Sequence, residues 1–558
     1  MHKPWLKSYP PGVPPNIDWK AYRSLVDLLD ESFRRYAARP AAESMDRVIT
    51  FGEVDHGSQA LAAWLQAKGL APGARVAIMM PNILQYMIAI PAVLRAGMVV
   101  VNVNPLYTAR ELEHQLKDSG AEAIILLENF AATLEQVVDR TNIRHVVLAA
   151  LGDMLGAKGW MVNFVVRKVR KMVPPFQLTK GGGRTVTRFN TALLEGRGLP
   201  LKRAPLTPDT VAFLQYTGGT TGVSKGATLL HRNVVANILQ TEAWFMPVLD
   251  KLGDKPLVIV CALPLYHIFA LTACYMLGAR RGMMNLLIAN PRDIPAFVQV
   301  LKKHRVHMFP AVNTLFNAIA HAPDIAQVDF SQLVISNGGG MAVQQATAEK
   351  WLKVTGCPVI EGYGLSETSP VATVNRLDGQ FTGAIGLPIP STEITIRDDE
   401  GNEVPLGEVG EICIRGPQVM AGYWNQPEET AKALGADGYF KSGDIGFMNE
   451  AGLVKIVDRK KDMILVSGFN VYPNEIEQIV ALHPGVLECA AVGIPDEKSG
   501  EAVKLFVVRR DPALTEQALS RYCIENFTSY KRPRQIEFRA DLPKTAVGKI
   551  LRRELRAK

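Results

Sequence analysis

Short apolar runs alternate along the chain with longer segments whose apolar residues recur at helical spacing. Residues 76–103 are the most apolar stretch, and Pro81, Pro91 and Arg95 interrupt it. We interpret it as a buried strand, a helix and a second buried strand, because a membrane-spanning helix needs about 20 uninterrupted apolar residues. Residues 110–121 have the spacing of a helix. This alternation predicts α/β sheets.

Composition excludes several classes of protein. The 558 residues are 47% hydrophobic and 21% charged, which suits large cores in two or more domains. The net charge of +8 favours anionic partners. No zinc-ligand spacing, aromatic RNA-binding motif or dense basic helix accompanies it, so nucleic acid is not expected. The six cysteines have no metal or redox spacing, and residues 1–15 lack the apolar segment of a signal peptide, so a cytoplasmic protein is predicted.

A segment rich in glycine and hydroxyl side chains follows the apolar run 211–214. It reads Tyr-Thr-Gly-Gly-Thr-Thr-Gly-Val-Ser-Lys-Gly over residues 216–226. Glycines let backbone N–H groups face an anion, and threonine hydroxyls and a lysine add donors, so this composition predicts a phosphate cradle. The position of Lys225 does not fit the P-loop of ATPases and GTPases. An ordinary glycine turn is the structural alternative.

Five segments in a fixed order resemble the adenylate-forming superfamily of acyl-CoA synthetases, luciferases and peptide-synthetase adenylation domains. They are residues 216–226, Leu-Pro-Leu-Tyr-His at 263–267, Glu-Gly-Tyr-Gly-Leu-Ser-Glu-Thr at 361–368, Ser-Gly-Asp at 442–444 and Pro-Lys-Thr-Ala-Val-Gly-Lys at 543–549. Within that superfamily, residues 104–112 and 457–473 are most similar to bacterial long-chain fatty-acid CoA ligases. The resemblance covers nearly the whole chain.

The resemblance implies an α/β fold with two unequal domains. Residues 1–459 would form a large N-terminal domain of two α/β sheets and a distorted β-barrel. Residues 460–558 would form a small mobile α+β domain with its hinge near Lys461. The implied reaction joins a fatty acid to coenzyme A: the carboxylate attacks ATP, diphosphate leaves, and the thiol then displaces AMP from the acyl-adenylate. ATP, Mg²⁺ and coenzyme A are therefore expected ligands.

Roles for individual residues also follow from the resemblance. Lys549 would catalyse adenylation, Glu367 and Thr217 would hold Mg²⁺, Thr368 would contact the α-phosphate, and His267 would position the substrate carboxylate. Positive charge is required because the reaction brings two anions together. The residues expected to bind the nucleotide or its cosubstrate are Thr217, Gly218, Gly219, Thr220, Thr221, Gly222, Lys225, Gly338, Gly339, Gly340, Glu361, Gly362, Tyr363, Gly364, Asp444, Arg459 and Gly468.

Five of these residues have an ordinary structural alternative. His267 lies on an apolar segment and could be a core histidine, while Tyr363 could simply pack. Asp444 and Arg459 could be a surface ion pair, and Lys549 could be solvated charge. Segment 264–271 contains no acidic residue, so we expect a substrate carboxylate without a neighbouring ammonium group.

Within residues 154–176, six of the large apolar side chains recur at roughly helical spacing, and four of the basic residues lie beside them. We interpret them as an amphipathic helix that binds an anionic membrane surface at the cytoplasmic face of the inner membrane. A core-facing helix with a solvated basic face is the alternative. The apolar residues are Trp160, Met161, Phe164, Val165, Val169 and Met172, and the basic ones are Arg167, Lys168, Arg170 and Lys171.

Several functions remain open at this point. The enzyme could activate medium-chain or aryl acids, or it could deliver acyl-adenylates to a carrier protein. A lipid-sensing membrane scaffold that kept the fold is the alternative without catalysis. The sequence does not specify acyl chain length or oligomeric state, and a homodimer is compatible with it.

Overall fold

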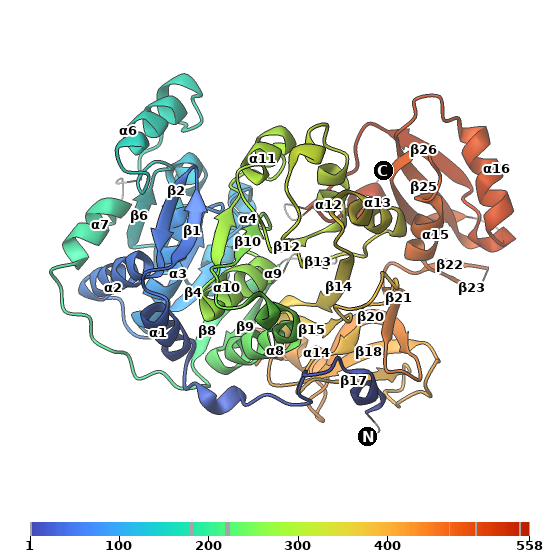
Figure 1. Cartoon of the computed structure of the whole chain (residues 1–558), viewed down its shortest axis with the longest axis horizontal. Coiled ribbons are helices and arrows are strands. Elements are labelled where there is room, and N and C mark those ends of the chain that lie inside the picture. Colours follow the sequence, from blue (N-terminus) through green and yellow to red (C-terminus); the bar gives the residue numbers. More distant parts are fainter. Residues whose placement is uncertain are drawn as a thin grey trace.

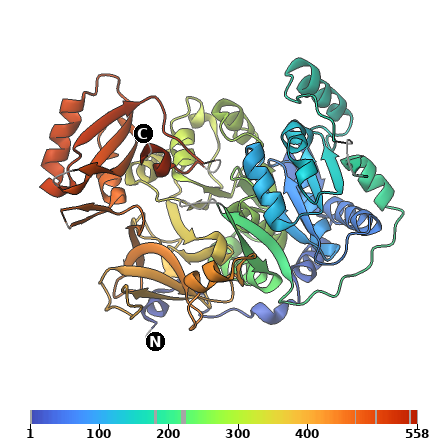
Figure 2. The ribbon, with the colours of Figure 1, turned by 180° about the vertical axis from the view of Figure 1, so that it is seen from behind.

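The computed structural model describes residues 3–178, 183–217, 224–467, 469–496, 499–545 and 548–556 (Figure 1). Two large sheets lie at the centre, a smaller antiparallel sheet lies beside them, and a C-terminal domain is set at one end of the molecule. Figure 2 shows the same arrangement from behind. The predicted pair of α/β sheets is confirmed.

The first large sheet has eight strands in the order β19-β9-β8-β4-β3-β5-β6-β7. The six strands from β8 to β7 are parallel, and β9 and β19 continue the sheet antiparallel to their neighbours. The strands are β3 (Arg75–Met79), β4 (Val99–Asn102), β5 (Ala123–Leu127), β6 (His145–Ala149), β7 (Thr185–Arg188), β8 (Val211–Thr217), β9 (Lys225–Leu230) and β19 (Gly422–Tyr423).

The second large sheet has nine strands in the order β16-β15-β14-β13-β12-β10-β11-β1-β2. It is parallel from β14 to β1 and antiparallel at both edges. The strands are β1 (Pro40–Ser44), β2 (Arg47–Thr50), β10 (Val258–Cys261), β11 (Met284–Leu287), β12 (Met308–Ala311), β13 (Ile335–Gly338), β14 (Val359–Gly364), β15 (Val371–Val374) and β16 (Leu387–Pro388).

A third, antiparallel sheet has the order β17-β18-β20-β21. The expected distorted barrel is not closed among the described residues, because four strands are too few to surround a packed interior. Its strands are β17 (Glu393–Arg397), β18 (Gly410–Arg415), β20 (Phe440–Met448) and β21 (Val454–Arg459).

The C-terminal domain is a five-stranded sheet covered by helices, with a core of its own. Ile476, Leu505 and Leu519 are fully buried in that core. The strands are β22 (Ile464–Val466), β23 (Phe469–Val471), β24 (Val486–Asp496), β25 (Gly500–Arg509) and β26 (Gln535–Arg539), and the helices are α15 (Pro473–Val480), α16 (Glu516–Asn526) and α17 (Arg552–Arg556).

Helices cover the two large sheets. The expected strand, helix and strand within 76–103 are β3, α3 and β4, and the expected helix at 110–121 is α4. The helices are α1 (Leu25–Arg35), α2 (Phe51–Ala67), α3 (Leu84–Arg95), α4 (Ala109–Ser119), α5 (Ala131–Glu135), α6 (Ala157–Phe164), α7 (Phe189–Gly196), α8 (His231–Leu249), α9 (Ile268–Ala270), α10 (Leu277–Arg281), α11 (Ile294–Leu301), α12 (Asn313–Ala320), α13 (Gln345–Thr355) and α14 (Pro427–Ala433).

Strand β3 shows why the parallel strands of the large sheets are continuous apolar runs in the sequence. Val76 and Ile78 pack into the large central core, which also contains α2 and α3. Ala77 and Met79 point the other way, into a second core that contains Leu112 of α4. Successive side chains of a strand face opposite sides, so a sheet buried on both faces needs apolar residues at every position.

Helix α6 projects from the end of the molecule opposite the C-terminal domain in both views (Figures 1 and 2). It continues as a π-helix over Val165–Val169. The six apolar side chains predicted for this segment are all exposed, Trp160 to 77%, so they do not form a core-facing surface, whereas Val166 of the same segment is buried. None of the described helices is long and apolar enough to span a bilayer.

Candidate active site

A cleft of about 2100 Å³ lies where the three N-terminal sheets meet the C-terminal domain. Strands β8, β14 and β20 contribute their ends to its wall, and the segment around Lys549 completes it from the far end of the chain. Most of the residues expected from the sequence to act chemically line this cleft. The described ones are Thr217, Lys225, His267, Gly338, Gly339, Gly340, Glu361, Gly362, Tyr363, Gly364, Glu367, Asp444, Arg459, Lys461 and Lys549.

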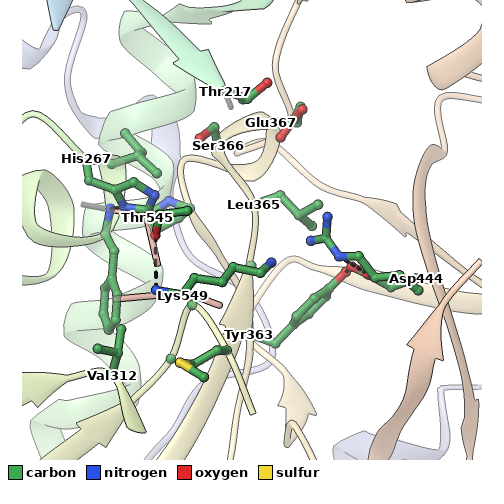
Figure 3. Close-up of a pocket in the computed structure, with 18 of the residues that line it drawn as sticks. Thr217, His267, Val312, Tyr363, Leu365, Ser366, Glu367, Asp444, Thr545 and Lys549 are labelled. Atoms are coloured by element: carbon green, nitrogen blue, oxygen red, sulfur yellow. Dashed lines mark hydrogen bonds and ion pairs between the residues drawn. The ribbon is translucent and has the colours of Figure 1, made fainter. Parts of the chain in front are cut away.

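Asp444 is the centre of a hydrogen-bonded group on one side of the cleft (Figure 3). Its carboxylate accepts a hydrogen bond of 2.6 Å from the Tyr363 hydroxyl and forms an ion pair of 3.0 Å with Arg459. The pairing of β20 with β21 places Asp444 directly opposite Arg459. These two contacts fix the carboxylate beside an aromatic ring, an arrangement that can accept sugar hydroxyls next to a stacked base.

Lys549 extends into the cleft toward the Tyr363–Asp444 pair (Figure 3). Its loop is closed by two hydrogen bonds with Thr545, of 3.0 Å to the hydroxyl and 2.7 Å from the amide. The Thr314 hydroxyl of α12 donates to the Gly548 carbonyl at 3.3 Å and so links the loop to the N-terminal domain. Burial, helped by the charge of Arg459, lowers the pKa of Lys549 to about 7.

His267 is held as a neutral imidazole. Its Nδ1 accepts a hydrogen bond of 3.3 Å from the Phe269 amide at the start of α9. Burial, with a contribution from the charge of Lys549, lowers the pKa of His267 to about 4. The remaining proton is then on Nε2, because a neutral ring has one donor and one acceptor nitrogen. That N–H can donate to a substrate carboxylate.

Glu367 is a buried carboxylate suited to a cation. The Tyr423 hydroxyl donates to it at 2.8 Å, and no salt bridge reaches it within the described part of the chain. Burial raises its pKa. Thr217 lies close by in Figure 3. Because Mg²⁺ is usually held by one or two carboxylates together with substrate phosphates, these residues fit a magnesium site.

Lys225 begins β9, opposite Thr217 at the end of β8. Its ammonium forms an ion pair with Glu429 of α14 and lies 5.3 Å from the centre of the Tyr423 ring. The cation of the predicted phosphate cradle is thus in the cleft. The other cradle residues and one cosubstrate residue lie outside the described chain: Gly218, Gly219, Thr220, Thr221, Gly222 and Gly468.

Thr368 differs from its expected place. It is fully buried and does not line the cleft. Its hydroxyl donates to the Pro370 carbonyl and accepts a hydrogen bond of 2.9 Å from the Leu365 amide, so it shapes its own turn. The neighbouring Ser366 lines the cleft instead. We interpret Thr368 as a residue that fixes the turn carrying Glu367.

Glu361 also has a distinct environment. One of its oxygens accepts a hydrogen bond of 3.1 Å from the Val343 amide, while the other is buried without a partner among the described residues. Burial raises its pKa to about 8. The group is therefore mostly protonated at neutral pH and contributes little negative charge to the cleft.

Three contacts of the cleft were not predicted. Tyr423 holds Glu367, Thr314 holds the Lys549 loop, and Glu429 holds Lys225. Tyr423, Thr314 and Glu429 lie outside the motifs that carry the resemblance. Their roles depend on pairing between segments more than 50 residues apart, the closest pair being separated by 56.

Fold and cleft together define an enzyme that binds a nucleotide between a large and a small domain. The chain belongs to the AMP-binding enzyme family, which matches residues 29–424, and the C-terminal domain of AMP-binding enzymes matches residues 475–549. Known relatives are similar in sequence to this chain over its full length. The chain is 54% identical to the long-chain-fatty-acid–CoA ligase of Escherichia coli O6:H1, over 100% of this chain and 98% of that protein. It is 53% identical to the long-chain-fatty-acid–CoA ligase of Salmonella typhimurium LT2, with the same coverage.

The fold is also shared with solved structures. The anthranilate CoA ligase AuaEII in complex with anthranoyl-AMP superposes with a TM-score of 0.83 at 25% identity, over 97% of this chain and 98% of that chain. The prediction of a large N-terminal domain followed by a small C-terminal one is thereby confirmed.

The lowered pKa of Lys549 predicts a pH dependence. If the ammonium form is active, kcat/KM for ATP should fall about tenfold per pH unit above about 7, because the free enzyme loses this charge as pH rises through its pKa. Lys549→Arg should remove the falling limb, since arginine stays charged. Initial rates between pH 6 and 9 test this. A falling limb that persists unchanged in Lys549→Arg would contradict the assignment.

Gly548 predicts a steric constraint on the same loop. Its φ is +82°, and an added Cβ would lie 2.7 Å from the Thr314 Oγ1. Gly548→Ala should therefore move Lys549 and lower the rate of adenylation by about tenfold, since about 1–2 kcal/mol of backbone strain is added to the clash. Gly401→Ala is the matched control, with φ +89° and nothing within 4 Å. Adenylation rates reduced equally in both variants would refute the contact.

Proposed function

We propose that the chain is a long-chain fatty acid–CoA ligase. It converts a fatty acid, ATP and coenzyme A into acyl-CoA, AMP and diphosphate through an acyl-adenylate. The observation that carries this proposal is the meeting of Lys549 with Glu367, His267 and Asp444 in one cleft. The names of relatives 53% and 54% identical over the whole chain support the substrate class.

In the first half-reaction a carboxylate oxygen attacks the α-phosphorus of ATP, and the bond to diphosphate breaks. His267 donates from Nε2 to the carboxylate and orients it. The Lys549 ammonium would contact both the attacking carboxylate and the α-phosphate and would offset the negative charge that develops there. Tyr363 stacks on adenine, Asp444 and Arg459 hold the ribose, and the cradle around Lys225 binds the β- and γ-phosphates.

Glu367, together with Thr217, would hold Mg²⁺. The ion supplies charge neutralisation on the phosphates when it is bound. Tyr423 donates to Glu367 at 2.8 Å and fixes the carboxylate in place. Thr368 acts indirectly by shaping the turn that carries Glu367.

In the second half-reaction the thiol of coenzyme A attacks the acyl carbonyl, AMP leaves, and the thiol proton is released. We place the domain boundary at residues 459 and 460 and the hinge at Lys461, between the end of β21 and the start of β22. Arg556 donates to the carbonyls of Lys461 and Asp462 at 3.3 and 3.1 Å. These bonds connect the hinge with the C-terminal segment that carries Lys549. Rotation of the small domain about Lys461 would therefore move the hinge segment and Lys549 together. Gly468 would then approach the pantetheine.

The acyl chain would occupy the apolar part of the cleft. Phe245, Leu263, Ile268, Phe269 and Val312 line it. An acyl chain gains about 0.8 kcal/mol for each methylene that leaves water, so an apolar wall favours long acids. No oligomeric state follows from these contacts, and the homodimer stays a prediction.

An acid panel tests the proposed reaction. Purified protein with ATP, Mg²⁺ and coenzyme A should form acyl-CoA and diphosphate most efficiently with long acids in a C4–C18 series. Lys549→Ala should lower the rate about a hundredfold or more, since it removes a group that stabilises the transition state. Diphosphate without thioester would indicate a different acceptor, such as a carrier protein, and neither product would favour the scaffold.

We further propose that α6 and the π-helix after it bind the surface of an anionic membrane. Trp160 and Phe164 are 77% and 50% exposed and stack with ring centres 6.1 Å apart. Arg167 pairs with Glu128 at 2.7 Å and fixes the helix to the first large sheet. Lys168 and nearby basic residues remain exposed to meet anionic head groups.

If this helix binds the membrane, removal of the aromatic pair should weaken the binding of the protein to vesicles. Replacing Trp160 and Phe164 by alanine should weaken sedimentation with anionic vesicles about tenfold or more, because each buried aromatic side chain contributes about 1.5–3 kcal/mol. Leu194→Ala on α7 is the control, since Leu194 is 69% exposed but lies outside this helix. Equal vesicle binding by all three proteins would contradict the assignment.

A further inference from the structure

The lysine of the phosphate cradle already has an anionic partner. Lys225 forms an ion pair with Glu429, and the Lys432 ammonium holds the other oxygen of the same carboxylate at 2.7 Å. The side chains of Lys225 and Glu429 are each 33% exposed, and both line the cleft. A carboxylate therefore lies at the point where the proposed function places the terminal phosphates of ATP.

Strand pairing fixes the position of this carboxylate. Strand β19 pairs with β9, so Tyr423 lies opposite Ala227, two residues from Lys225. The Tyr423 amide donates to the Thr430 hydroxyl of α14 at 2.8 Å, which ties the helix to the strand. Glu429 precedes Thr430, so it faces Lys225 as a consequence of the fold.

The same short element also reaches the proposed metal carboxylate. The Tyr423 ring lies beside the Lys225 ammonium, and its hydroxyl donates to Glu367. Tyr423 thus contacts both the Glu367 carboxylate and the cation that pairs with Glu429. Lys225 and Lys432 lower the pKa of Glu429 to about 2, so it is ionised at every pH at which the enzyme works.

Glu429 and a triphosphate would make the same kind of contact with Lys225. An ammonium is a compact point charge that binds carboxylate or phosphate oxygens through the same donors. The β- and γ-phosphates carry more charge than one carboxylate, and like charges repel. Binding of the triphosphate and the ion pair with Glu429 are therefore in competition.

We propose that Glu429 is a resident counter-ion of the phosphate cradle: it holds Lys225 until the β- and γ-phosphates of ATP displace it, and takes Lys225 back as diphosphate leaves. The inference rests on the proposed binding of ATP in this cleft. It makes Glu429 a positioning residue that weakens the binding of both ATP and diphosphate and so assists product release. AMP lacks these two phosphates and is unaffected.

Affinities for three ligands test the proposal. Calorimetric titration of the full chain with ATP, diphosphate and AMP should show that Glu429→Gln binds ATP and diphosphate about two- to fivefold more tightly, the range expected for a partly exposed ion pair. Its affinity for AMP should equal that of the unmodified protein, which also shows that the fold is intact. Glu428→Gln is the matched control, an exposed acid one residue earlier on the same helix.

These titrations distinguish failure of the Glu429 proposal from failure of the proposed function. Unchanged affinities in Glu429→Gln, or equal gains in Glu428→Gln, would overturn the proposal. Weaker ATP binding in Glu429→Gln would also overturn it and would mean that Glu429 holds Lys225 in its phosphate-binding pose. If the unmodified protein bound none of the three ligands, the proposed function itself would fail.

Discussion

Arg552 makes the interaction on which the geometry of the cleft depends. Its guanidinium lies between Asp458 of β21, Asp462 of the hinge segment and Glu477 of α15, at 3.3, 3.4 and 2.7 Å. Asp458 is fully buried, and breaking a buried pair of this kind costs about 3–5 kcal/mol. Lys549 lies three residues before Arg552, so the contacts that join the two domains also decide where its ammonium lies.

Two cations of the cleft are paired with carboxylates that belong to the protein itself. Arg459 faces Asp444, and Lys225 faces Glu429. Among the residues that the structure describes, no carboxylate forms an ion pair with Lys549: Asp444 is held by Tyr363 and Arg459, and burial lowers the pKa of the lysine. A group without a fixed counter-ion can respond to charge that develops during the reaction, whereas a paired one mainly positions a ligand.

Much of this organisation could be predicted because it is local in the sequence. Apolar runs between turn signals specify strands such as β3, and the motif around Glu367 or Lys549 requires particular residue types at fixed spacing. Contacts such as those of Lys225 with Glu429 and of Thr314 with Gly548 join residues 204 and 234 positions apart. No spacing rule specifies them, since they exist only after the sheets have assembled.

The structure differs from the sequence-based expectation at Thr368 and in the third sheet, and the two differences have the same origin. Thr368 has the right residue type for a phosphate contact, but its hydroxyl is used by neighbouring backbone groups in its turn. The third sheet has strands of the expected kind, yet β17 and β21 remain its edges. Both depend on how a segment is completed by its surroundings, which a motif does not encode. The amphipathic pattern of α6 was predicted from spacing because helical periodicity is local, while the exposure of its apolar face is evident only in the structure.

The central claim is that a carboxylate attacks the α-phosphorus of ATP in this cleft. Its most direct test is a single turnover with a long-chain fatty acid labelled with ¹⁸O in both carboxyl oxygens, followed by mass spectrometry of the nucleotide. Attack at the α-phosphorus predicts one ¹⁸O atom in AMP after coenzyme A is added, and none in diphosphate. Label in inorganic phosphate or diphosphate, or AMP without label, would contradict the account.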